Sequence, residues 1–181
     1  MAFDAFIKID GIEGESTDEK HSAWIEMISY DCGVDQKASA TASSVGGASA
    51  ERADFDKFTF RKLLDKASPK LAMACAGGTH IDSVIVEICR SGDDKVKYME
   101  YKMTNCIIGS VKTSGGGEFP SENVAIDFGK IQWAYTVQKR QGGGAAGNVA
   151  GIISFMADLP GGDGVVARKG VKDDEIKRTH C

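Results

Sequence analysis

Residues 3–33 read FDAFIKIDGIEGESTDEKHSAWIEMISYDCG, and this stretch decides the fold of the chain. Its first seven residues, Phe3–Ile9, alternate in the manner of a β-strand, and a second strand pattern lies within His21–Gly33. Large apolar side chains occupy both faces of that second predicted strand: Trp24, Ile28 and Tyr30 on one face, Ile25 and Met27 on the other. An antiparallel strand at the surface of a small barrel normally has one polar face. We therefore expect one face to pack on the core and the other on a neighbouring subunit.

The rest of the chain is also mainly β in pattern. Further predicted strands are Asp54–Arg61, Val84–Ile88, Lys97–Met103, Cys106–Val111 and Asn123–Gln138. In the last of these the apolar residues change parity at Gly129-Lys130, which predicts a β-bulge that bends the strand. One helix is predicted, with Ser68 as its N-cap, Pro69 in the first turn and Gly77-Gly78 as its stop. Two turns of helix are too few to build a layer, so we expect this helix to plug a barrel.

A run of small residues from Lys37 to Ala50 has no large apolar anchor. It cannot bury enough surface to hold itself on the domain, which predicts a long projecting loop. Such loops are uncommon in compact domains unless they have a function. Disordered filler is the alternative, and the sequence leaves both open.

Composition limits the classes of function. A chain of 181 residues fits one main domain, and its net charge of −4 gives no general attraction to nucleic acid or to an anionic membrane. Asp4 and Lys8 interrupt the first apolar run, so no cleavable signal peptide is expected, and no apolar run approaches the roughly 20 residues of a membrane span. We expect folding in the cytosol. The five cysteines contain no Cys-x-x-Cys pair and are predicted to be buried or incidental thiols, with Cys181 the most exposed; they are Cys32, Cys75, Cys89, Cys106 and Cys181.

The chain offers little for catalysis. None of the three histidines has a second His or Cys at metal-ligand spacing, so no metal and no cofactor are expected. The nearest catalytic pattern is Cys75 followed by His80 and Asp82, which defines the alternative hypothesis of a thiol-dependent hydrolase. Cys75 falls on the apolar face of the predicted helix, which favours packing, and the protein is not expected to be an enzyme. A monomeric barrel that binds a small apolar ligand is a third class, but the large inward residues predict a filled interior.

Several segments together resemble one known family. They are Phe6–Ile9, Gly14–Ser16, His21, Gly33 with Gln36, Phe58–Phe60, Asp65–Leu71, Ala74–His80 and Glu122–Val124. In this order they resemble the hemolysin-coregulated protein (Hcp) family, the tube subunit of bacterial type VI secretion systems. The resemblance runs from Met1 to about Gly151. The segments are specific for the family together, whereas any one of them alone would be a weak signal.

The resemblance implies a mainly β fold, a β-barrel of two curved antiparallel sheets with one short α-helix, assembling as a hexameric ring. Stacked rings would form a tube that a contractile sheath expels, carrying effectors in its lumen or behind a spike. The implied partners are copies of the chain, the sheath, the spike and effectors, without nucleic acid or membrane insertion. The implied location is the cytoplasm before firing, then the extracellular medium or a target cell.

The resemblance also implies site residues. Asp31 matches the lumen-facing segment, where a carboxylate from every subunit would disfavour acidic cargo. Independently of the resemblance, the second apolar face of the strand within His21–Gly33 places Trp24, Ile28 and Tyr30 at the subunit interface. The loop that reaches toward the next ring comprises Ser43, Ser44, Val45, Gly46, Gly47, Ala48 and Ser49.

The C-terminal end departs from the family pattern. Relatives commonly close with a Gly-Trp-Asp-Leu strand after the segment seen here as Gly147–Ala150, whereas this chain continues differently. We therefore divide it into a barrel domain, 1–151, and an atypical segment, 152–181. Ile152–Met156 can supply a short strand, and Val171–Cys181 is charged enough to be disordered unless a partner holds it. The sequence is compatible both with an evolved cargo-binding extension and with a frameshifted or engineered C-terminal end.

Overall fold

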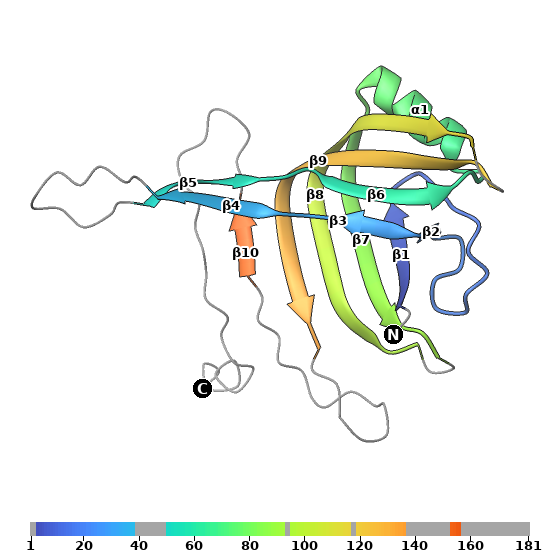
Figure 1. The fold of residues 1–181 in the computed structure, drawn as a ribbon, viewed down its shortest axis with the longest axis horizontal. Coiled ribbons are helices and arrows are strands. Elements are labelled where there is room, and N and C mark those ends of the chain that lie inside the picture. Colours follow the sequence, from blue (N-terminus) through green and yellow to red (C-terminus); the bar gives the residue numbers. More distant parts are fainter. Residues whose placement is uncertain (1–2, 39–49, 93–94, 117–118, 137–152, 157–181) are drawn as a thin grey trace, which may run out of the picture.

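A computed structural model describes residues 3–38, 50–92, 95–116, 119–136 and 153–156 (Figure 1). The elements in this part of the chain are β1 (Phe3–Ile9), β2 (Ile25–Met27), β3 (Ser29–Asp31), β4 (Val34–Ala38), β5 (Ala50–Phe55), β6 (Phe58–Leu63), α1 (Ser68–Gly77), β7 (His80–Arg90), β8 (Lys97–Ser114), β9 (Ser121–Tyr135) and β10 (Ile153–Met156). The prediction of a mainly β, barrel-like fold with one short helix is confirmed.

One antiparallel sheet forms the barrel. Its strands follow the order β2-β1-β7-β8-β9-β6-β3, and β10 pairs with the free side of β9. The two curved sheets that we expected are thus halves of one hydrogen-bonded sheet. Its two end strands, β2 and β3, are separated in sequence only by Ile28. A single segment therefore pairs with β1 on one edge and with β6 on the other, which nearly closes the barrel.

This crossing corrects the predicted faces of the second strand. Ile25 and Met27 are buried in the interior, as one face of the prediction required. Tyr30 was placed on the opposite face, but its ring packs toward the interior, 6.0 Å from Phe58 and 5.8 Å from Tyr101 between centroids. The alternation of inward and outward residues is interrupted at Ile28, because the chain leaves one edge of the sheet there and joins the other. Ile28 itself is half exposed.

The long strands β7, β8 and β9 bend together (Figure 1). At the bend, the inward-facing residues of each strand change between odd-numbered and even-numbered positions. The buried residues before and after the change are Ile81 and Val84 on β7, Met103 and Cys106 on β8, and Ile126 and Ile131 on β9. Asn105 has a left-handed φ of 62° at this level of β8. A Cβ on Gly129 would lie 2.8 Å from its Nδ2, so glycine lets β9 pass close to that side chain.

The predicted change of face at Gly129-Lys130 is confirmed, but the predicted bulge there is wrong. The β8–β9 register runs unbroken through Gly129, and it shifts instead between Ile108 and Ser110. The strands β7, β8 and β9 all change their inward face at the same height of the sheet. No strand therefore has an extra residue relative to its neighbour there, and no bulge forms.

Helix α1 closes one end of the barrel (Figure 1). It buries Leu71 and Ala74 and ends at Gly78, whose φ of 60° suits glycine. The predicted N-cap is wrong by one residue: Ala67 is the cap position and makes no side-chain capping bond. The hydroxyl of Ser68 takes part in a buried charged network instead, described below.

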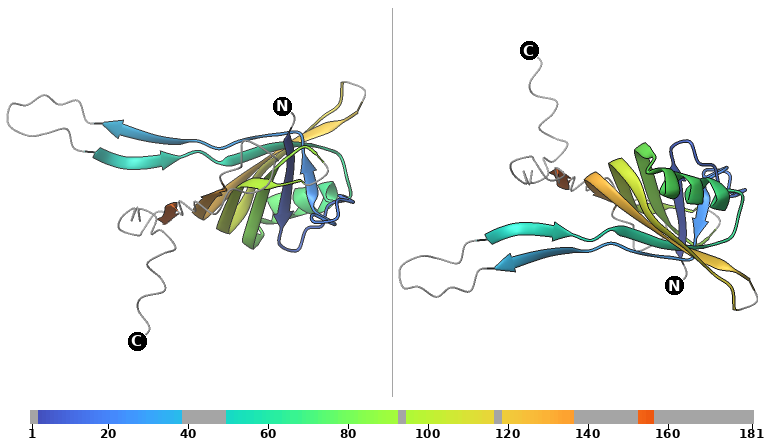
Figure 2. Two further views of the ribbon diagram at one scale, coloured as in Figure 1. Left: turned by 90° about the horizontal axis from the view of Figure 1, so that it is seen from below. Right: turned by 90° about the horizontal axis from the view of Figure 1, so that it is seen from above.

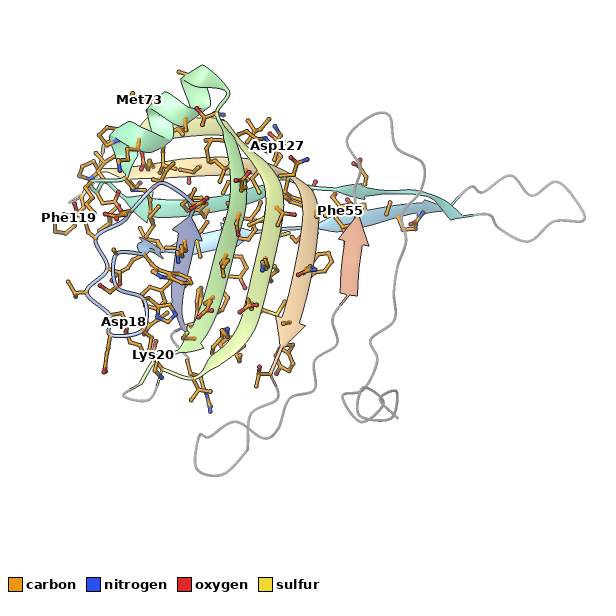
Figure 3. All side chains as sticks on the ribbon, turned by 180° about the vertical axis from the view of Figure 1, so that it is seen from behind. Asp18, Lys20, Phe55, Met73, Phe119 and Asp127 are labelled. Atoms are coloured by element: carbon orange, nitrogen blue, oxygen red, sulfur yellow. The ribbon has the colours of Figure 1, made fainter. Side chains whose placement is uncertain are left out.

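Among the described residues, strands β4 and β5 pair with each other and with no other strand, and they extend away from the barrel (Figures 1 and 2). We call this hairpin the arm. Phe55 fixes its root, since its ring stacks 6.3 Å from that of Trp133 and meets Phe128 edge-on at 6.5 Å (Figure 3). The sequence predicted a projecting loop over part of this region, and the structure shows ordered strands at its flanks.

Candidate functional site

The residues proposed for a thiol hydrolase do not form a catalytic pair. Cys75 lies half-buried on α1, and His80 is exposed at the start of β7. Within the described part of the chain no hydrogen bond joins them, and no three His, Cys, Asp or Glu side chains are grouped to hold a metal ion. Burial raises the pKa of the Cys106 thiol to about 12, which keeps it protonated. Nothing in the described residues supports the hydrolase alternative.

His21 is the centre of a cover on the outer side of β1. The segment between β1 and β2 folds over Phe6, whose ring stacks on the imidazole at 4.1 Å with an angle of 3°. Trp24 meets the same imidazole edge-on at 5.0 Å. His21 is only 2% exposed in this sandwich. The second apolar face that the sequence showed near Trp24 is thus partly covered by the chain's own aromatic residues.

Two carboxylates hold the imidazole of His21. Its Nδ1 lies 2.7 Å from Oδ1 of Asp18, and its Nε2 lies 2.9 Å from Oε2 of Glu87 on β7. Ionised carboxylates only accept hydrogen bonds, so a ring nitrogen that carries a proton donates to the carboxylate facing it. Lys95 and Lys97 complete the cluster, with Lys95 Nζ 2.6 Å from Asp18 and Lys97 Nζ 2.8 Å from Glu87.

These contacts lower the pKa values of both carboxyl groups. For Asp18 the hydrogen bond from Lys95 is the largest influence, and it outweighs burial. For Glu87 burial acts in the opposite direction, but the bonds from Lys97 and His21 together outweigh it, so its pKa also falls. Both groups therefore favour the folded state while they are ionised.

We expect acid to loosen this cover. The ordinary pKa values of the two groups are 3.8 and 4.5, and both are lower in the folded protein. Their contribution to the free energy of unfolding is thus fully present above those values and is lost as the pH falls below them. Urea unfolding of wild type and of Glu87→Gln from pH 7 to pH 3 checks this. The variant should show a smaller loss on acidification, whereas Asp10→Asn, at an exposed carboxylate, should follow wild type. Equal losses in wild type and Glu87→Gln would contradict the assignment.

A second charged network lies inside the barrel, beneath the start of α1. Lys62 is fully buried, with its Nζ 2.7 Å from Oε1 of Glu122, 2.6 Å from Oδ1 of Asp65 and 2.9 Å from the carbonyl oxygen of Leu63. The Ser68 hydroxyl donates to Glu122 at 2.7 Å. The network ties β6, β9 and the first turn of α1 together.

The point where the sheet closes has an exposed apolar surface. Ile28, Leu63 and Leu64 are 50%, 46% and 41% exposed. With Met27 they form the apolar part of an open hollow of about 440 Å³, whose polar lining is Glu15, Ser16, Thr17, Glu26 and Asp65. We call Ile28, Leu63 and Leu64 the apolar edge. Clustered exposed apolar side chains are typical of surfaces that another protein covers.

The root of the arm is acidic. Asp31 and Asp56 lie beside Cys32, and burial, followed by these two charges, raises the pKa of its thiol to about 11. A Cβ on Gly33 would lie 2.4 Å from Oδ2 of Asp56, so glycine leaves room for that carboxylate. Asp31 is exposed at the end of β3, where it pairs with Thr59.

The predicted interface and loop residues separate into three groups. Ile28 is exposed, as the prediction required, whereas Trp24 and Tyr30 are only partly exposed because they pack on His21 and Phe58. The predicted ring-stacking loop, Ser43–Ser49, lies outside the described residues.

Sequence reasoning missed the two buried charged networks. A signal for one of them was present, because Phe58, Phe60 and Lys62 share one parity on β6, which places the lysine inside. The pairing of His21 with Glu87 gave no such signal, since the two residues are 66 positions apart.

These features define a class: a nearly closed β-barrel with a projecting arm, and with exposed surfaces suited to contacts between proteins. A family model described as "Type VI secretion system effector, Hcp" matches residues 6–135. Protein hcp1 of Pseudomonas aeruginosa is 34% identical over 152 residues, covering 82% of this chain and 93% of that protein. The chain belongs to the Hcp family and is a type VI secretion tube protein.

Solved structures agree with this assignment. A type six secretion system protein has a TM-score of 0.79 at 30% identity, covering 86% of this chain and 96% of its own. Hcp1 from Salmonella typhimurium has a TM-score of 0.68, also at 30% identity, covering 86% and 95%. In the described residues no helix has the length and apolar character to cross a membrane.

Proposed function

We propose that this protein forms hexameric rings that stack into the inner tube of a type VI secretion system and carry effectors in the lumen. Membership of the Hcp family supports the tube. The observation that carries the proposal is the apolar edge, together with an arm that leaves the barrel and pairs with no other described strand. Both features need a second molecule to cover them.

Each predicted site has a place in this proposal. Ile28, with Leu63 and Leu64, contacts the neighbouring subunit, and the partly exposed Trp24 and Tyr30 contribute to the same interface. Asp31 faces the lumen, where repeated carboxylates favour basic over acidic cargo. The loop Ser43–Ser49 contacts the next ring. Further partners are the sheath, the spike and effectors, and the route is from the cytoplasm to the medium or a target cell.

Electron microscopy of the purified full chain, with sedimentation over a range of concentrations, tests ring and tube formation. We expect rings with a central hole. A protein that remains monomeric at every concentration would contradict the proposal.

A charge on the apolar edge is expected to block assembly. In Ile28→Asp, burying the new carboxylate against a neighbour without a partner is costly, so rings should give way to monomers at concentrations where wild type is assembled. Met73→Asp is the matched control, since Met73 is 74% exposed on α1 (Figure 3). Circular dichroism verifies that both variants are folded. Rings of normal size in Ile28→Asp would remove this residue from the interface.

A further inference from the structure

The root of the arm carries three carboxylates, besides the proposed lumen-facing Asp31, without a cationic partner in the described chain. The acidic root comprises Asp35, Asp54 and Asp56, all exposed. Asp35 and Asp54 are directly opposite across β4 and β5, an arrangement that is unfavourable for like charges. Asp56 adds to the same negative surface beside Cys32.

The outer face of the barrel carries lysines that are likewise unpaired among the described residues. The lysine face comprises Lys8 on β1, Lys102 on β8 and Lys130 on β9, all exposed. Ile85 joins the first two in register, because it pairs with both Lys8 and Lys102. Lys102 pairs with Gln132, which makes it a diagonal neighbour of Lys130, at a spacing of about 7–8 Å.

Nearby carboxylates leave part of this face unneutralised. Glu87 and Glu100 lie on the same side of β7 and β8, but both bind Lys97, and Glu87 also binds His21. Glu26 on β2 is opposite Phe6, which makes it a diagonal neighbour of Lys8. The positive charge available to another molecule is therefore mainly that of Lys102 and Lys130.

We propose that the acidic root of one copy docks on the lysine face of a second copy. The two surfaces have opposite charge, and a neighbour's ammonium groups between Asp35 and Asp54 would relieve their repulsion. The arm extends away from the barrel and does not turn back over its own sheet, so one molecule cannot make the contact with itself (Figure 2). This inference rests on the proposed function and names surfaces that the assembly uses.

The contact has a consequence for symmetry. The root of the arm and the sheet face are different surfaces, so the contact is heterologous: each copy gives its arm to one neighbour and its face to another. Repetition of such a contact closes a ring or extends a fibre, and it does not stop at a two-fold dimer.

Charge reversal of the full chain tests the docking. Variant A carries Asp35→Lys and Asp54→Lys, and variant B carries Lys102→Asp and Lys130→Asp. Each variant alone places like charges against each other, so we expect at least about a tenfold rise in the concentration needed for assembly, measured by light scattering. An equimolar mixture should assemble again, because the reversed arm of A fits the reversed face of B and the acidic arm of B fits the basic face of A. Lys112→Asp, an exposed lysine outside both surfaces, is the charge control.

The outcomes separate this inference from the proposed function. If wild type assembles and A and B assemble equally well, the docking is wrong and the tube proposal stands. If A and B are folded but their mixture stays dissociated, the docking is also wrong. If wild type itself never assembles, the tube proposal fails.

Discussion

Replacement of Lys62 by methionine is expected to lower the free energy of unfolding by about 3–5 kcal/mol. Methionine fills a similar volume but removes the only cation that bonds to Glu122 in the described structure. Glu122 is 1% exposed, so its carboxylate would remain buried without a counter-charge. Urea denaturation of purified protein at neutral pH measures the loss.

Two further variants identify the cause. Lys57→Met removes an ion pair with Asp127 in which both side chains are substantially exposed, so its cost should be within about 1 kcal/mol (Figure 3). Lys62→Met combined with Glu122→Gln removes both buried charges and should recover part of the loss. A Lys62→Met protein as stable as wild type would show that the network adds nothing to stability.

Replacement of Phe58 by alanine should cost about 3–5 kcal/mol for a different reason. Phe58 is fully buried, and its ring contacts those of Tyr30, Phe60 and Tyr101. The substitution leaves a cavity between β6 and the interior, and it removes the surface on which Tyr30 packs. Because Tyr30 belongs to β3, the closing edge of the sheet should be affected most.

Hydrogen exchange measures this local effect beside global unfolding. The β3 amides paired with β6 should exchange faster in Phe58→Ala, whereas those between β1 and β7 should change less. Phe119→Ala is the matched control, since Phe119 is 65% exposed in the β8–β9 turn (Figure 3). Its stability should lie within about 0.5 kcal/mol of wild type. Similar losses in the two variants would contradict the role given to Phe58.

The sequence predicts the class of fold well because alternation is a local property. The patterns around Ile7, Val86 and Phe60 place these residues inward, and the structure buries all three. Local glycine and proline signals likewise predict the helix to within one residue of its observed start. These features depend on neighbours in the chain.

The faces near Tyr30 and the register near Gly129 could not be predicted in the same way. Tyr30 faces inward because β2 and β3 pair with different edges of the sheet, and pairing partners are set by the whole topology. At Gly129 the sequence shows one strand changing face, but only the neighbouring strands reveal that all three change together. The His21–Glu87 contact is also non-local, whereas Lys62 could have been predicted from its parity on β6.

The double pairing at Ile28 also bears on how the chain folds. The barrel closes at this point only when β1 also pairs with β7, with Phe3 opposite Arg90, and β6 pairs with β9, with Leu63 opposite Ser121. Contacts between residues so distant in sequence slow folding, because a large loss of chain entropy precedes them. During synthesis, the N-terminal strands emerge well before β7 and β9 exist. Closure of the barrel at Ile28 therefore depends on contacts between residues from most of the chain.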